Sequence, residues 1–227
     1  MAPTHALPQS RRVRDLLEFA LPVLRAGDQR LLEHPRIREV FPEYLVLAHG
    51  VVRASVPLME TALAVARTRP DEVARLLAGY LEQHIPEEVG HDEWLLGDLE
   101  FLGVPRERVL SQVPSAAVAA LVGSQYYWIH HVDPVGLLGY VALLEGYPPV
   151  HADVDRVRTA TGFGEAAFRT LLLHAELDQG HRDELDELLD ALPLTDAQRS
   201  LVGLSALTSV QLYGRAQDEL LDRYGGG

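Results

Sequence analysis

The sequence predicts an all-α protein, with about seven helices in a single domain. Leu, Ala and Val recur at spacings of three and four residues along almost the whole chain, and no segment shows the period of two that is typical of a strand. The chain has 227 residues, of which 47% are hydrophobic, so it is long enough for one domain with a complete core. Glycine and proline divide the helical pattern into blocks.

We expect a loose leader at residues 1–10, one helical domain over 11–224 and a flexible tail over 225–227. The predicted helical blocks are 11–26, 37–68, 71–103, 114–146, 151–160, 164–192 and 195–223. Asp71 after Pro70 marks a helix start, and the segment from Thr195 to Gln198 has the spacing of a capping box. Gly103-Val-Pro105 and Gly146-Tyr-Pro-Pro149 mark helix ends. Prolines at 57, 86 and 134 predict kinks in three of the long helices, because each removes a backbone donor.

Composition excludes several classes of function. The chain has no cysteine, which excludes disulfides, zinc-thiolate sites, iron–sulfur clusters and a thiol nucleophile. Its net charge of −13 disfavours binding to nucleic acid and to anionic membranes. No apolar run approaches the ~20 residues of a membrane span, and the N-terminus lacks the layout of a secretion signal. We therefore expect a cytoplasmic globular protein.

Two segments share one pattern of histidine and carboxylate, in which the residues lie at positions i, i+4 and i+7. The triplets are His84, Glu88 and His91, and His174, Asp178 and His181. On a helix these positions fall within about 60° of arc, so all three side chains of a triplet project from one stripe. At this composition chance places on the order of 0.06 such triplets in a chain, so two indicate a function.

Both stripes continue into leucine, which predicts that they face the core. Leu77 and Leu81 extend the first stripe, and Leu185 and Leu188 extend the second. A buried carboxylate without a partner costs several kcal/mol. Imidazole nitrogen and carboxylate oxygen are ligands that iron and manganese accept, so two facing triplets could hold one metal ion or two.

Two further carboxylates, Glu60 and Glu145, lie in apolar helical surroundings. With Glu88, His91, Asp178 and His181 they resemble the ferritin-like di-iron pattern, in which two helices supply a Glu and two supply Glu-x-x-His. The additional His84 and His174 exceed what that pattern requires.

A second resemblance is closer and covers roughly residues 35–215. EEVGHDEW at 87–94, the run from Tyr126 to Pro134 that continues to Pro148, and the spacing of the second triplet are similar to the haem-oxygenase-like di-iron oxidases and oxygenases. The resemblance implies a bundle of that fold. It implies as catalytic metal ligands Glu88, His91, Glu145, His174, Asp178 and His181.

The early Glu of that family is where this sequence departs. Arg53 and Ser55 occupy the expected region, and Glu60 is displaced from it by about 5 residues, or ~7 Å along a helix. His84 and His49 are alternatives for completing the first iron site. We therefore count Glu60 and His84 with the six implied ligands as candidate metal residues.

The resemblance further implies two Fe(II) ions per chain, O2 as the oxidant, and a small amino-acid-like or carboxylate metabolite as the substrate. The reaction would be desaturation, decarboxylation, N-oxygenation or C–C cleavage, in specialised-metabolite biosynthesis, and a homodimer is a family expectation. One alternative is a ferritin-like iron-storage protein, against which the interior prolines and extra histidines argue. The other is a metal-free oxidase of the haem-oxygenase-like fold.

Overall fold

The computed structural model describes residues 7–225, except for the side chains of Asp178 and Gln179. Helices account for nearly all of this range and no strand occurs in it, which confirms the all-α prediction. The helices are α1 Gln9–Ala20, α2 Pro22–Leu32, α3 Ile37–Ala66, α4 Glu72–Glu88, α5 His91–Phe101, α6 Arg106–Ser111, α7 Ala116–His131, α8 Leu137–Leu144, α9 His151–Thr161, α10 Arg169–Ala191 and α11 Asp196–Arg223. Two short 3₁₀ turns, η1 Pro134–Gly136 and η2 Glu165–Ala167, precede α8 and α10.

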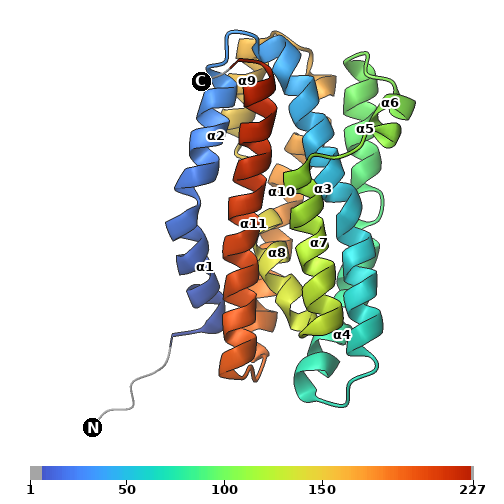
Figure 1. Ribbon diagram of the computed structural model, residues 1–227, viewed down its shortest axis with the longest axis vertical. Coiled ribbons are helices and arrows are strands. Elements are labelled where there is room, and N and C mark those ends of the chain that lie inside the picture. The colour runs from blue at the N-terminus through green and yellow to red at the C-terminus, as the bar shows by residue number, and fades with distance from the viewer. Residues whose placement is uncertain (1–6, 226–227) are drawn as a thin grey trace.

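The long helices lie side by side along one axis of an elongated bundle (Figure 1). α11 packs against α1, α2, α7 and α8, and α3 packs against α4, α5 and α7. The contact between α8 and α11 is especially close at Gly139. A Cβ atom there would lie 2.3 Å from the carbonyl oxygen of Val202, so only glycine fits without a shift.

Two of the predicted helix starts are confirmed in detail. The Asp71 side chain accepts a hydrogen bond from the backbone N–H of Ala74 at 3.0 Å and caps α4. Thr195 and Gln198 form the capping box that opens α11. These caps satisfy backbone donors that the first turn of a helix leaves without partners.

The expectation of one continuous helix over 71–103 is wrong. α4 ends at Glu88, Val89 is extended, and Gly90 has φ = 95°, a left-handed conformation that favours glycine. α5 then begins at His91. His91 is therefore brought to its place by a turn and does not share a helical stripe with Glu88.

Two other expected blocks are also divided, in both cases just before a proline. Residues 11–26 break at Leu21, before Pro22 opens α2, and residues 114–146 break at Val132 and Asp133, before Pro134. A proline is tolerated in the first turn of a helix but not in its interior. Three prolines are exceptions, because α3 continues through Pro42 and Pro57 and α4 continues through Pro86 to Glu88.

The chain ends differ slightly from expectation. α1 begins at Gln9, within the expected leader, and the backbone N–H and hydroxyl of Ser10 donate to the carboxylate of Asp190 on α10 at 2.8 and 2.9 Å. The rest of that leader, residues 1–6, and residues 226–227 of the expected tail lie outside the described range. None of the helices within residues 7–225 combines the length and the apolar character that crossing a bilayer requires.

Candidate metal centre

The structure brings six of the eight candidate metal residues into one cluster at the junction of four helices. α4 supplies two, α5 one, the C-terminal end of α8 one, and α10 two. They are His84, Glu88, His91, Glu145, His174 and His181. Asp178 belongs to α10, but its side chain lies outside the described part of the chain.

The first half of the cluster pairs His84 with Glu145, the residue that caps the C-terminus of α8. His84 is fully buried, and its Nε2 lies 3.0 Å from Oε1 of Glu145. Burial disfavours the imidazolium, but the hydrogen bond to Glu145 and the surrounding carboxylates outweigh it and raise the pKa of His84 to about 9. Burial also raises the pKa of Glu145. The pair therefore retains a proton at neutral pH. The ring of His181 meets that of His84 edge-on, with centroids 4.9 Å apart.

The second half pairs His91 with His174, whose ring centroids are 4.9 Å apart. Nδ1 of His174 lies 2.8 Å from the carbonyl oxygen of Thr170, one turn earlier on α10. Because a carbonyl only accepts, Nδ1 carries the proton and the lone pair of Nε2 remains available to a metal. Burial lowers the pKa of His174 despite that hydrogen bond, which keeps the imidazole neutral as a ligand must be.

Glu88 lies between the two halves. Its Oε2 is 3.1 Å from Nδ1 of His91, and its Oε1 is 3.3 Å from Nδ1 of His181. Burial opposes ionisation, but the hydrogen bond from His91 and the nearby imidazoles of His91, His84 and His181 outweigh it and lower the pKa of Glu88. The carboxylate is therefore ionised at neutral pH, with one oxygen directed to each half.

Several buried atoms of this cluster have no hydrogen-bond partner among the side chains that the structure describes. They are Nδ1 of His84, Oε1 of Glu88 and Oε2 of Glu145. Buried polar atoms are almost always paired, because each unpaired one costs about 1–3 kcal/mol. Ligand atoms of His84, Glu88 and His181 also lie within 4.8 Å of one another. Unpaired nitrogen and oxygen atoms converging in this way fit a bound transition-metal cation.

Aromatic rings cover both halves of the cluster. Tyr80 stacks on His84 with centroids 5.0 Å apart, and Trp94 stacks on His91 at 4.1 Å. Burial raises the pKa of Tyr80 well above its ordinary value, so its hydroxyl keeps its proton. That hydroxyl is buried and has no hydrogen-bond partner among the described residues. Tyr80 and Trp94 were not identified from the sequence, although each lies one helical turn from a candidate ligand.

A hydrogen bond from another helix holds the start of α10. Phe168, at the N-terminal cap of α10, makes no capping bond through its side chain. Asp98 on α5 takes this role, because its buried carboxylate accepts from the backbone N–H of Thr170 at 2.9 Å. This bond ties the helix that carries His174 to the one that begins at His91. Nothing in the spacing of the sequence predicts it.

The structure does not bring Glu60 to the cluster. Its side chain is exposed on α3 and lines a hollow of about 530 Å³ between α3 and α7, together with Tyr126 and His130. Glu60 therefore faces a different part of the bundle from His84. His49 is buried in α3, near the charges of Arg53, Asp92 and Glu93, and it lies outside the cluster as well.

The profile of a protein family described as iron-containing redox enzymes matches residues 43–214. The chain belongs to this family. The matched range contains all six clustered residues. The search of curated proteins found no match.

Two solved structures share the fold. A domain of unknown function with a heme oxygenase-like fold from Shewanella denitrificans OS217 superposes with a TM-score of 0.77 at 20% identity, covering 95% of this chain and 91% of that one. A TenA homolog from Pseudomonas syringae pv. tomato DC3000 superposes with a TM-score of 0.65 at 13% identity, covering 90% and 92%. This member of the iron-containing redox enzyme family therefore has the haem-oxygenase-like fold that its motifs predicted.

Proposed function

We propose that the protein is a non-haem di-iron enzyme that uses O2 to oxidise a small amino-acid-like or carboxylate metabolite. The observation that carries this proposal is the position of Glu88 between two pairs of histidines, one oxygen 3.1 Å from His91 and the other 3.3 Å from His181. A carboxylate in that position can bridge two metal ions. A single ion would leave one of the two imidazole pairs without a role.

The residues divide into two ligand sets that share Glu88. His84, Glu145 and His181 would hold one iron, and His91 and His174 the other, with Asp178 added by its resemblance to the family motif. Sets of histidine and carboxylate with open positions are typical of non-haem Fe(II) oxygenases. Iron, when bound, supplies the redox chemistry with O2.

The residues of the chain exclude water from the site and fix the orientation of its polar groups. Burial of His84, Glu88 and Glu145 excludes water, which strengthens each polar interaction within the cluster. The hydrogen bond that Nδ1 of His174 donates to the carbonyl oxygen of Thr170 fixes the tautomer and orientation of His174. The hydroxyl of Tyr80, buried and unpaired beside His84, is a donor that can bind an oxygen atom of a ligand.

The substrate and reaction follow the family resemblance. We propose desaturation, decarboxylation, N-oxygenation or C–C cleavage, as a step of specialised metabolism, carried out by a homodimer or a single chain. The alternatives differ in what they predict. Iron storage predicts uptake of iron without turnover of an organic compound, and a metal-free oxidase predicts no affinity for Fe(II). The buried nitrogen and oxygen atoms of the cluster that lack hydrogen-bond partners among the described residues disfavour the metal-free alternative.

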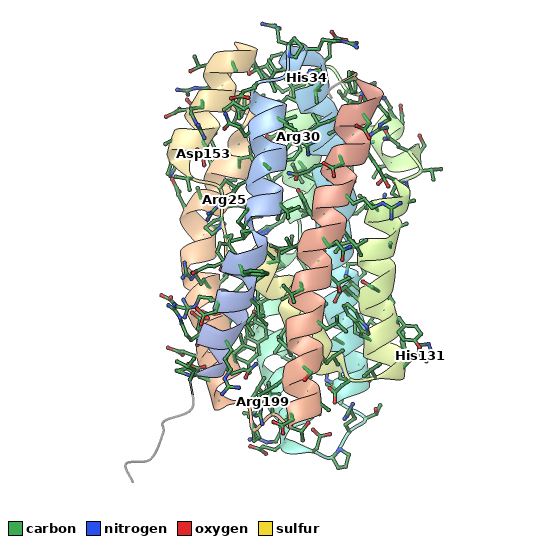
Figure 2. All side chains as sticks on the ribbon, turned by 60° about the vertical axis from the view of Figure 1, so that its left-hand side comes forward. Arg25, Arg30, His34, His131, Asp153 and Arg199 are labelled. Carbon is green, nitrogen blue, oxygen red and sulfur yellow. The ribbon has the colours of Figure 1, made fainter. Side chains whose placement is uncertain are left out.

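Anaerobic titration with Fe(II) tests the proposal directly. The wild-type protein should bind two ions per chain, and His174→Ala should lose at least one while keeping its helical circular dichroism. His131→Ala is the matched control, because His131 is an exposed histidine at the end of α7 (Figure 2) and should leave both ions in place.

O2 consumption is then measured with the Fe(II)-loaded protein against a panel of amino acids and fatty acids. We expect a member of the panel to accelerate consumption in the wild-type protein and in His131→Ala, but not in His174→Ala. Two ions retained by His174→Ala would remove the ligand assignment. Iron uptake with no organic turnover would favour storage.

A further inference from the structure

A second group of metal-binding side chains lies at the outer edge of the cluster. Glu87 on α4 and Glu184 on α10 are exposed, and their carboxylates approach His84 so that one ligand atom from each of the three residues lies within 4.8 Å of the others. The Glu87 side chain is 49% exposed, so a cation in solution can reach it. His84 belongs both to this outer group and to the buried group with Glu88 and His181.

The buried imidazole of His84 points to a ligand at this position. His84 has no exposed surface, and within the described part of the chain its Nδ1 has no hydrogen-bond partner. That atom faces Oε2 of Glu87 across 3.6 Å, too far for a hydrogen bond. Exposed carboxylates by themselves are ordinary surface groups. A buried nitrogen without a hydrogen-bond partner is unusual, because its desolvation is not compensated, and a bound cation would compensate it.

The exposed carboxylate of Glu87 faces His84 and His181, the two imidazoles that also contact the buried carboxylates. Its Oε2 lies 3.6 Å from Nδ1 of His84 and 3.7 Å from Nε2 of His181. The opposite nitrogens of these two rings face Glu145 at 3.0 Å and Glu88 at 3.3 Å. Each imidazole therefore has one edge toward the exposed carboxylate and the other toward a buried one.

We propose that His84, Glu87 and Glu184 form an outer cation site at which Fe(II) is captured before it reaches the buried centre. This inference rests on the proposed function, because it assumes that the buried cluster is the final site. Two carboxylates concentrate a divalent cation, and electrostatic attraction of this kind speeds capture by about 10-fold or more. His84 is shared by the two sites, so the ion exchanges carboxylate partners while keeping an imidazole ligand within reach.

The kinetics of iron binding separate this capture step from the final affinity. Because Trp94 stacks on His91, Fe(II) bound at the buried centre should quench the fluorescence of Trp94. The other tryptophan, Trp128, lies on α7, which supplies no residue of the cluster, so Trp128→Phe provides a background with one reporter. Metal-free protein in that background is mixed anaerobically with Fe(II), and the rate of quenching is recorded along with the final stoichiometry.

Glu184→Gln should slow the quenching on the order of tenfold and leave the stoichiometry unchanged. Glu87→Gln should slow it at least as much, because Glu87 faces both histidines. Asp183→Asn is the matched control, since it removes the same charge from the neighbouring exposed position on α10, and its rate should stay within about twofold of the parent.

Three outcomes would overturn the inference in distinguishable ways. Equal rates for Glu184→Gln and Asp183→Asn would show that no capture site exists there, while the buried centre and its two ions stand. A stoichiometry reduced by Glu184→Gln would make Glu184 a resident ligand and not a capture residue. A parent protein that binds no Fe(II) would remove both the outer site and the proposed function.

Discussion

Replacement of Gly90 by alanine isolates the backbone cost of the turn that separates α4 from α5. Gly90 has φ = 95°, and a left-handed conformation costs an L-residue about 1–2 kcal/mol. A Cβ atom at this position would meet no atom within 4 Å, so no steric clash adds to that cost. We expect Gly90→Ala to lower the free energy of unfolding by about 1–2 kcal/mol.

Gly97 offers a control with the opposite sign. It is an exposed glycine in the next helix, α5, and a Cβ atom there would also meet no atom within 4 Å. Alanine in a helix interior is favoured over glycine by about 0.5–1 kcal/mol, so Gly97→Ala should stabilise the protein by that amount. The two variants should therefore differ by about 1.5–3 kcal/mol, or about 3–12 °C in Tm for a domain of this size.

Thermal and urea unfolding, followed by circular dichroism, measure both variants under identical conditions. Shifts of the same sign, or a Gly90→Ala variant as stable as the wild type, would refute the reasoning. Fe(II) affinity provides a second measurement. Gly90 lies between Glu88 and His91, whose side chains are 3.1 Å apart, so Gly90→Ala should weaken iron binding more than Gly97→Ala does.

Three further predictions concern packing, pH and protons. Gly139→Ala should lower the free energy of unfolding by about 1–3 kcal/mol, because the added Cβ would overlap the backbone of α11. Urea unfolding measures this change, and an unchanged midpoint of the urea transition would contradict the close contact. Burial raises the pKa of Asp98 from its ordinary 3.8 despite the hydrogen bond from Thr170. The stability linked to this proton is complete below pH 3.8 and is lost as the pH rises through the raised pKa. Asp98→Asn keeps a hydrogen-bond acceptor but has no carboxyl proton to lose. Its stability relative to the wild type should therefore increase with pH over that window. Plots of stability against pH that run parallel for the two proteins would contradict this prediction. Because the pKa of His84 is about 9, binding of Fe(II) near neutral pH should displace a proton. The affinity for Fe(II) should therefore increase by up to about tenfold per pH unit toward pH 9. Titrations in dilute buffer would measure the released proton, and an affinity that does not change with pH would contradict the prediction.

The fold class and half of the centre could be predicted because they depend on one helix at a time. His174 and His181 lie on a single uninterrupted helix, α10, so their spacing alone predicts that they share a face. The same holds for His84 and Glu88 on α4. His91 was included through a helical spacing that does not exist, since the chain turns at Gly90 and returns the side chain to Glu88 by a different path.

The residues that were missed or misplaced depend on how helices pack together. Glu60 has apolar neighbours in the sequence, but its own side chain lines the hollow between α3 and α7 and does not reach the cluster. Glu184 belongs to an acidic run that predicts a solvated helix face, and it is indeed exposed. Its approach to Glu87 arises only where α10 meets α4, which no local pattern records.

Three groups of the centre stand at the ends of helices: Glu88 closes α4, His91 opens α5, and Glu145 follows α8. A terminal residue is held by backbone bonds on one side only, so the adjoining turn determines its direction. An altered turn at Val89 and Gly90 would re-aim two donor groups while the framework of α3 and α11 stays intact. The chemistry of this bundle can thus change through the lengths and conformations of a few turns, while the long helices stay the same.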